Sequence, residues 1–290
     1  MRRTLEFAVA VLLAGAAAVG AAAPAPRIVS LSPGLTELVY AAGAGEQLVG
    51  TTAYTDYPAA ATRLPQIGDA FHIDVERLVA LKPDLVLAWA SADPPALLAR
   101  LRGLGFKVAV FEPRTLADIA ANLRRIGKLA GTSAEAEQAA QAVEQGLKRL
   151  REQYAGREPV RVFYEISAHP LYTINGKQII SQGIELCGGR NIFADLPSLA
   201  APVSVAAVIA RNPEAIVTGG DGNGNGVKNR LDAWRRWPQV TAVTNNALFS
   251  VPADQIARAT PRMLEGIKTI CRDLEKARQS MRSAPLSGQH

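Results

Sequence analysis

The sequence contains few of the residues on which metal sites and catalytic motifs depend. Its 290 residues include two cysteines and three histidines, and one of these, His290, is the last residue. Neither His72 nor His169 accompanies a nucleophile motif, since GxSxG, HExxH and Walker sequences are all missing. With so few nitrogen and sulfur ligands, the sequence favours neither a resident metal nor an enzyme.

No apolar run after the first 26 residues is long enough to cross a membrane. The chain starts with Arg2 and Arg3, an apolar run at Phe7–Val19 and small residues at Gly20–Ala23. A membrane helix needs about 20 residues, so this shorter run is typical of a cleaved signal peptide. We expect residues 1–26 to direct export, with a retained N-terminal anchor as the alternative.

Basic residues are in modest excess and do not gather in one stripe. The formal net charge is +6, and Lys and Arg are spread along the chain beside Asp and Glu. Nucleic-acid binding needs a clustered basic surface, so no nucleic-acid partner is expected. Hydrophobic residues make up 48% of the chain, enough for a sizeable core. The chain is longer than the ~100–200 residues usual for one domain, which indicates two domains.

The two cysteines, Cys187 and Cys271, would meet an oxidising environment in an exported chain. An isolated pair there predicts one disulfide, which would close a long loop and contribute ~2–5 kcal/mol. Two separate buried thiols are the alternative.

Short apolar strands alternate with helices in the first third of the chain. Strands are expected at Arg27–Ser32, Leu48–Thr51, Leu85–Trp89 and Lys107–Phe111. Helices are expected at Val75–Leu81, at Pro95–Gly103 and at Thr36–Ala42, the last with Thr36 as N-cap. This alternation predicts an α/β lobe with a parallel sheet over residues 27–130.

A long helical stretch separates the two halves. Leu116–Ala130 and Ala134–Tyr154 are interrupted only by a Gly-Thr-Ser turn, and the second is rich in strong helix formers. Twenty-one helical residues extend ~30 Å, the width of a small domain. The segment 131–158 is therefore predicted to be a rigid linking helix, because a flexible linker would have another composition.

Strand–helix alternation resumes in the second half and echoes the first. ERLVALKPDLVL at Glu76–Leu87 and AAVIARNPEAIV at Ala206–Val217 both join an apolar helix, a proline stop, an acidic residue and an aliphatic strand. We expect a second α/β lobe with a central parallel sheet at 159–280, followed by a flexible tail at 281–290. Two such lobes leave a cleft, where ligands commonly bind.

Several stretches together resemble a known family. They are RIVSLSPGLTE at Arg27–Glu37, YTDYP at Tyr54–Pro58, VERLVALKPDLVLAW at Val75–Trp89, CGGRNIF at Cys187–Phe193, and Asp254 to Arg262 with its Arg-Ala-Thr-Pro-Arg ending. The chain resembles the periplasmic binding proteins whose lobes are joined by a rigid helix, which serve importers of cobalamin, haem and ferric siderophores. The match covers essentially the whole mature chain and is most specific for the cobalamin-binding branch.

The resemblance implies a function without chemistry. A monomer in the periplasm would capture cobalamin or a related corrinoid as a transported ligand and deliver it to the permease of an ABC importer. Haem or a ferric siderophore is the alternative ligand. An enzyme on a related two-lobed scaffold is the rival from another class, because a fold alone does not fix a function.

The resemblance also implies five ligand-binding residues. Tyr54, Trp89 and Tyr172 would lie against the flat corrin, while Asp254 and Arg258 would hydrogen-bond to amides on its rim. Trp89 and Tyr54 follow strands, where ligands of α/β folds bind, and Tyr172 is expected in a loop. A surface ion pair between Asp254 and Arg258 is the alternative for those two residues.

The sequence departs from the pattern of the branch at two expected cleft aromatics. Ala70 stands at one of these positions, although Phe71 adjoins it, and Ala200 stands at the other. A cleft reshaped in this way leaves the choice between cobalamin, another corrinoid and haem open.

Docking on the permease depends in this family on one acidic residue from each lobe. Glu76 fits that role on the first lobe, but its repeat partner on the second lobe is Ala206. Glu214 and Glu185 are substitutes that do not hold the equivalent position. Charges at the rim of a protein–protein interface act mainly on the rate and orientation of encounter, so docking on the permease could persist in weaker form without the second acid.

Two metal hypotheses stay open beside this interpretation. Asp221-Gly-Asn-Gly-Asn-Gly followed by Asp232 matches the spacing of a calcium loop, with a plain Gly/Asn turn as the simpler account. His169 could ligate iron or cobalt through its imidazole.

Overall fold

The computed structural model describes residues 26–220 and 225–283. In the first lobe four strands form a parallel sheet in the order β2-β1-β3-β4. The strands are β1 Ile28–Ser30, β2 Leu48–Gly50, β3 Leu85–Trp89 and β4 Val108–Phe111. The helices between them are α1 Pro33–Ala41, α2 Val75–Ala80 and α3 Pro95–Gly103, with short 3₁₀ turns at Gly45–Gln47 and Ala59–Arg63. This lobe matches the predicted parallel α/β arrangement.

The second lobe has a larger sheet, in the order β10-β9-β5-β6-β8, with β7 also paired to β5. Its strands are β5 Val160–Ala168, β6 Leu171–Ile174, β7 Gly189–Asn191, β8 Ala200–Pro202, β9 Ala215–Gly219 and β10 Leu248–Val251. Its helices are α6 Ile179–Leu186, α7 Val205–Arg211, α8 Asn225–Trp234, α9 Thr241–Thr244, α10 Ala253–Ile256 and α11 Met263–Ser283. The centre is parallel as predicted, but β6 runs antiparallel to both of its neighbours.

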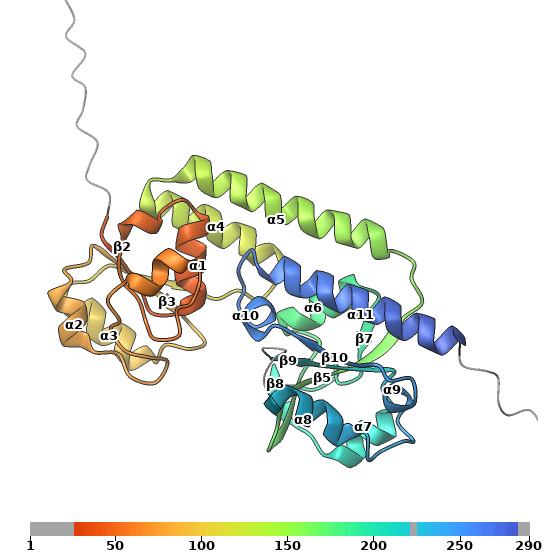
Figure 1. The fold of residues 1–290 in the computed structure, drawn as a ribbon. Coiled ribbons are helices and arrows are strands. Elements are labelled where there is room, and N and C mark those ends of the chain that lie inside the picture. The colour runs from red at the N-terminus through yellow and green to blue at the C-terminus, as the bar shows by residue number, and fades with distance from the viewer. Residues whose placement is uncertain (1–25, 221–224, 284–290) are drawn as a thin grey trace, which may run out of the picture.

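Two helices join the lobes. Helix α4 (Ala117–Ala130) ends at Gly131, whose φ of 78° only glycine adopts freely, and α5 (Ser133–Tyr154) follows at once. Figure 1 shows α5 running along one side of the molecule past both lobes, with α11 beside it. The 22 residues of α5 span ~33 Å. A Cβ on Gly146 of α5 would come within 2.7 Å of Leu264, so this glycine lets α11 pack closely.

One hydrophobic cluster extends through both lobes. It contains Ile28 and Leu35 of the first lobe, Leu123 of α4, and Val162 and Ile270 of the second lobe, all fully buried. A smaller cluster lies within each lobe. Opening the lobes would disrupt a continuous core, and close-packed interiors resist such deformation. The joint between the lobes is therefore stiff.

The internal repeat of the sequence is a repeat of structure. Lys82 and Asn212 occupy the same turn before the repeated proline, with φ values of 46° and 40°. After each proline a carboxylate accepts a backbone hydrogen bond at the start of the neighbouring strand. Asp84 accepts from the N–H of Arg27 at 2.7 Å, and Glu214 accepts from that of Arg161 at 2.8 Å.

Two boundaries differ from the sequence predictions. Helix α1 is capped by Ser32, which accepts from the N–H of Leu35, and starts at Pro33 rather than Thr36. Proline suits the first helical turn because the missing N–H needs no partner there. Helix α11 runs to Ser283, past the predicted start of the tail at residue 281. The predicted signal segment lies outside the described residues, except for Pro26.

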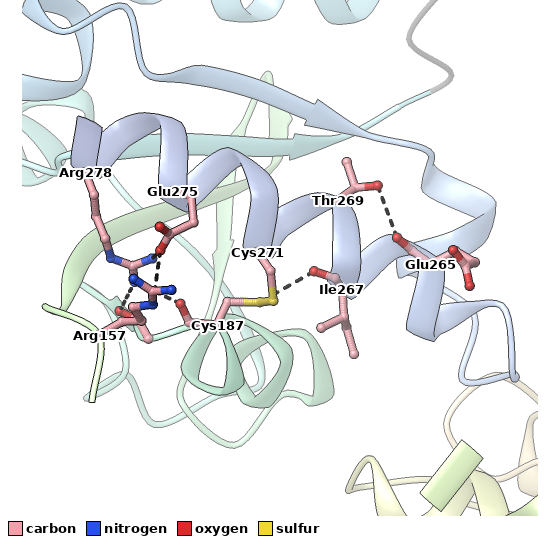
Figure 2. The surroundings of a disulfide bond; sticks show 9 residues. Arg157, Cys187, Glu265, Ile267, Thr269, Cys271, Glu275 and Arg278 are labelled. Atoms are coloured by element: carbon pink, nitrogen blue, oxygen red, sulfur yellow. Dashed lines mark hydrogen bonds and ion pairs between the residues drawn. A yellow bond between two sulfur atoms is a disulfide. The ribbon is translucent and has the colours of Figure 1, made fainter. Parts of the chain in front are cut away.

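The predicted disulfide is confirmed. Cys187, at the end of α6, is bonded to Cys271 in α11, and both residues are fully buried (Figure 2). The buried Arg278 guanidinium donates to the backbone carbonyls of Cys187, Gly188 and Glu158 nearby. The end of α6 is thus fixed to α11 by a covalent bond and by charge-assisted hydrogen bonds.

Candidate functional site

Strand ends from the two lobes meet at one place. Gly34 lies in the first turn of α1 just after β1, Trp89 ends β3, and Arg258 follows α10, the short helix after β10 in the second lobe. A Cβ on Gly34 would lie 3.7 Å from Trp89 Cζ2 and 3.8 Å from Arg258 Cβ. The carboxyl ends of parallel strands are where α/β folds bind ligands. The structure therefore brings Trp89 and Arg258, two of the predicted ligand-binding residues, to the same place.

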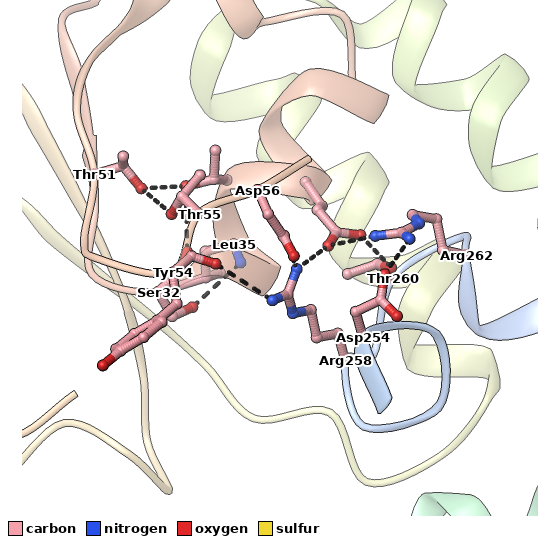
Figure 3. A network of polar contacts seen from close by, with 12 residues as sticks. Ser32, Leu35, Thr51, Tyr54, Thr55, Asp56, Asp254, Arg258, Thr260 and Arg262 are labelled. Atoms are coloured by element: carbon pink, nitrogen blue, oxygen red, sulfur yellow. Dashed lines mark hydrogen bonds and ion pairs between the residues drawn. The ribbon is translucent and has the colours of Figure 1, made fainter. Parts of the chain in front are cut away.

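A buried carboxylate lies at the centre of this meeting point. Glu37 of α1 is 2% exposed and accepts three hydrogen bonds from the second lobe, whose donors Arg258, Thr260 and Arg262 are labelled in Figure 3. Arg258 Nη1 lies 2.7 Å and Arg262 Nη1 3.3 Å from its Oε1, and Thr260 Oγ1 lies 2.9 Å from its Oε2. Burying a charge is costly unless it is paired, and here every oxygen has a partner.

Arg258 contacts the first lobe at three places. Besides Glu37, its Nη1 lies 2.6 Å from Asp56 Oδ1, and its Nη2 donates to the carbonyl of Tyr54 at 3.4 Å. Burial would lower the pKa of Arg258, but the hydrogen bonds that Arg258 donates to Asp56 and Glu37 outweigh burial and raise that pKa. Partial burial would raise the pKa of Asp56, but the bond to Arg258 holds it below its ordinary value. Both groups are fully charged at neutral pH.

Asp254 does not pair with Arg258, which was one alternative for these two residues. It pairs instead with Arg262, whose guanidinium also lies 4.2 Å from the centre of the Tyr57 ring. Asp254 and Arg262 both come from the segment between β10 and α11, so this pair stiffens the segment that carries Arg258.

Exposed aromatic side chains gather on the first lobe beside this network. Tyr54 is 80% exposed, with φ at 64°, and its ring points away from Arg258 (Figure 3). Phe71 is 98% exposed, in a turn whose N–H groups bond to Asp69. That turn lies beside the Tyr54 loop, because the N–H of Ala53 donates to the carbonyl of Gly68. Large exposed rings in ordered turns are typical of a binding surface.

Trp89 is half-buried at the end of β3. The ring centres of Trp89 and Phe111 lie 6.3 Å apart in an edge-to-face arrangement, and the backbone N–H of Trp89 donates to Asp93 Oδ2 at 2.7 Å. Burial raises the pKa of Asp93, and the bond from Trp89 only partly opposes that shift. The carboxylate thus fixes the backbone on which the indole stands.

A cavity of about 610 Å³ lies between the lobes. Ser91, Glu112 and Arg114 line it from the first lobe, and Asn175, Gln182 and Leu199 from the second. None of the five predicted ligand-binding residues lines it. The nearest in sequence is Trp89, two residues before Ser91. The wall from the first lobe follows β3 and β4, so it belongs to the same sheet edge.

Tyr172 lies elsewhere than expected. It stands half-buried on strand β6, not in a loop, and pairs with Pro202 of β8. Among the described residues, no hydrogen bond or ion pair joins Tyr172 to the other four predicted residues. β6 and β8 were missed because four- and three-residue strands carry little periodicity.

The predicted docking positions are equivalent in the two lobes. Glu76 is the second residue of α2, and Ala206 the second of α7, and both side chains are exposed. Each helix starts after a capping side chain, Asp74 or Ser204. The substitute Glu214 accepts from the backbone N–H of Arg161 at the start of β5 and pairs with the side chain of Arg161.

The structure gives little support to the calcium loop or to His169 as a metal ligand. Asp232, the last residue of the calcium pattern, lies on α8 and pairs with Arg235, while Asp221 falls outside the described residues. In residues 26–220 and 225–283, no group of three His, Cys, Asp or Glu side chains could hold a metal ion. His169 is exposed. Within the same residues, no helix is both long and apolar enough for a membrane span.

Sequence reasoning overlooked most of the polar network. Glu37, Asp56, Tyr57, Thr260 and Arg262 were not singled out, yet all lie in three of the stretches that carried the family resemblance. Those stretches are far apart in the chain and meet only in the fold. Opposite charges within them were the available signal.

Comparison with known proteins identifies the family. Residues 28–255 match the sequence pattern of the family described as periplasmic binding protein. A protein of Vibrio cholerae serotype O1 named vitamin B12-binding protein is 37% identical over 257 residues, covering 88% of this chain and 91% of that protein.

Solved structures give the same result for the fold. The crystal structure of the periplasmic vitamin B12 binding protein BtuF of Vibrio cholerae aligns with a TM-score of 0.81 and 36% identity, over 88% of this chain and 99% of that one. The periplasmic heme-binding protein RhuT of Roseiflexus aligns with a TM-score of 0.77 at 24% identity, over 87% and 99%. The chain belongs to the periplasmic binding protein family.

Proposed function

We propose that this protein binds cobalamin or a related corrinoid between its lobes in the periplasm and delivers it, unchanged, to the permease of an ABC importer. The observation that carries the proposal is the set of exposed rings on loops of the first lobe, Tyr54, Tyr57 and Phe71, together with half-buried Trp89 at the end of β3. A broad, flat, largely apolar molecule can cover such rings, each of which contributes ~150–250 Å² of contact.

The polar groups of the junction fit the rim of the same ligand. Arg258 donates and Asp254 accepts hydrogen bonds, and amides around a corrin offer both kinds of partner. The stiff joint supports capture with small lobe movement, because the core runs through both lobes. The relatives named for vitamin B12 support a corrinoid, whereas the heme-binding relative shares the fold at lower identity.

Permease docking would use Glu76 on the first lobe. Its counterpart Ala206 carries no charge, so the first lobe would supply most of the electrostatic orientation. Export through a cleaved segment at residues 1–26 belongs to the same proposal, and mass spectrometry of the periplasmic protein tests it.

Calorimetric titration of the purified protein with cyanocobalamin and with haemin tests the ligand. We expect saturable one-to-one binding of cyanocobalamin and much weaker binding of haemin. Tight binding of haemin alone would assign the cleft to haem instead. Recovery of intact cyanocobalamin after long incubation would support transport, and conversion to a new product would point to an enzyme.

A further inference from the structure

Glu37 and Asp56 both accept from the same guanidinium nitrogen, yet their surroundings differ sharply. The Glu37 side chain is 1% exposed, whereas that of Asp56 is 58% exposed. Three donors from the second lobe hold Glu37 in place. Apart from a bond with its own backbone, the Asp56 side chain accepts from Arg258 alone among the hydrogen bonds and ion pairs of the described residues.

We propose that Glu37 is a positioning residue that holds Arg258 across the lobe boundary, and that Asp56 competes with the ligand for Arg258. The inference rests on the proposed function, because it assigns roles around the ligand-binding Arg258. The group that replaces Asp56 must be a hydrogen-bond acceptor, such as an amide carbonyl on the rim of a corrinoid.

Geometry separates the two roles. Arg258 Nη1 lies 2.7 Å from Glu37 and 2.6 Å from Asp56, so one donor group is shared between them. Replacing Glu37 would leave Arg258 and Arg262 without their buried anion, at a large desolvation cost. Replacing Asp56 by a ligand oxygen keeps the donor satisfied, and the freed carboxylate is hydrated. The ligand therefore takes the place of Asp56, on the exposed side of Arg258, and leaves the bond to Glu37 intact.

The anchored segment also fixes other polar groups. Thr260 and Arg262 both bind Glu37, and Arg262 in turn binds Asp254. One buried carboxylate of the first lobe thus sets the position of the whole stretch 254–262 of the second lobe. A residue with this role acts on ligand affinity through the residues that it positions, Arg258 first among them, rather than by contact.

Affinity for cyanocobalamin tests the two roles with matched variants. We expect Asp56→Asn to raise the affinity about two- to fivefold, the scale of an exposed ion pair. Glu37→Gln is expected to lower it about tenfold or more. Asp195→Asn is the control, because Asp195 forms a similarly exposed pair with Arg211 in the second lobe. Reduced affinity in Asp56→Asn would overturn the competing role.

A double-mutant cycle distinguishes positioning from general damage to the fold. If Glu37 acts through Arg258, then Glu37→Gln combined with Arg258→Ala loses less affinity than the sum of the two single losses. Losses that add in the double variant would overturn the positioning role. Thr260→Val removes a single hydrogen bond to Glu37 and is expected to give a smaller loss, should Glu37→Gln fail to fold.

Hydrogen exchange measured without added ligand separates this inference from the proposed function. In Glu37→Gln we expect faster exchange of the backbone amides in 253–262, while the exchange of the amides in α3 stays as in the parent. Equal exchange in the variant and the parent would reject the anchor. If no variant binds cyanocobalamin but exchange rises as expected, the proposed ligand is wrong, whereas the anchoring by Glu37 stands.

Discussion

Removing the disulfide is expected to destabilise the second lobe strongly. The bond joins residues 84 positions apart, and the closed loop contains strands β7 to β10. Loop-closure entropy for that separation corresponds to about 4.6 kcal/mol at 25 °C. For a protein of this size, such a loss would lower the melting temperature by on the order of 9–18 °C.

The variant Cys187→Ala with Cys271→Ala tests this magnitude. Calorimetry of the variant and of the oxidised parent gives the shift, and reductant added to the variant is the control. An unchanged midpoint would refute the reasoning. It would mean that the Arg278 hydrogen bonds and the packing of α6 on α11 already restrict the loop in the unfolded ensemble.

Three further outcomes are expected. Trp89→Ala should weaken cyanocobalamin binding by ~1–3 kcal/mol in calorimetry if the indole stacks on the ligand. Glu76→Ala should leave that affinity unchanged and lower the rate of uptake into cells about two- to fivefold, since an exposed ion pair is worth ~0.2–1 kcal/mol. Burial raises the pKa of Glu165, although the indole N–H of Trp234 donates to its Oε2 at 2.7 Å. A raised pKa in the folded state means that stability falls as pH rises above the unfolded value of ~4.3. Urea midpoints of Glu165→Gln should therefore exceed those of the parent at about pH 8, and the gap should close near pH 4.

Each of these outcomes can fail in a specific way. Unchanged affinity in Trp89→Ala would mean that the indole only packs against Phe111. Uptake that is normal in Glu76→Ala would remove that residue from docking. A pH-independent gap for Glu165→Gln would mean that Glu165 keeps its ordinary pKa.

Much of the fold followed from the sequence for simple reasons. Apolar runs such as Leu85–Trp89 are buried on both faces of a parallel sheet, so they appear as continuous runs. The duplicated helix–proline–acid–strand pattern predicted two lobes. The acid is repeated because Asp84 and Glu214 each accept a backbone hydrogen bond at the equivalent place in their own lobe. The short antiparallel strands β6 and β8 were not predicted, since their pairing depends on neighbours that are distant in sequence.

The candidate site was predicted only in part. Trp89 and Arg258 were expected in one site, and both lie beside Gly34, although they come from the ends of two different sheets. Tyr172 was expected in a loop and lies on a strand. The sequence did not predict which charged residues form pairs: Asp254 contacts Arg262 rather than Arg258. Pairing of charges depends on the relative placement of two lobes, and local patterns carry no information about it.

By itself, the sequence determined the two α/β lobes, the rigid helix between them and the cysteine pair, because each depends on periodicity, composition or count. Only the tertiary structure decided that Glu37 would be buried beneath three donors from the other lobe. A carboxylate can lose its water only where donors replace it, and here those donors come from more than 220 residues further along the chain.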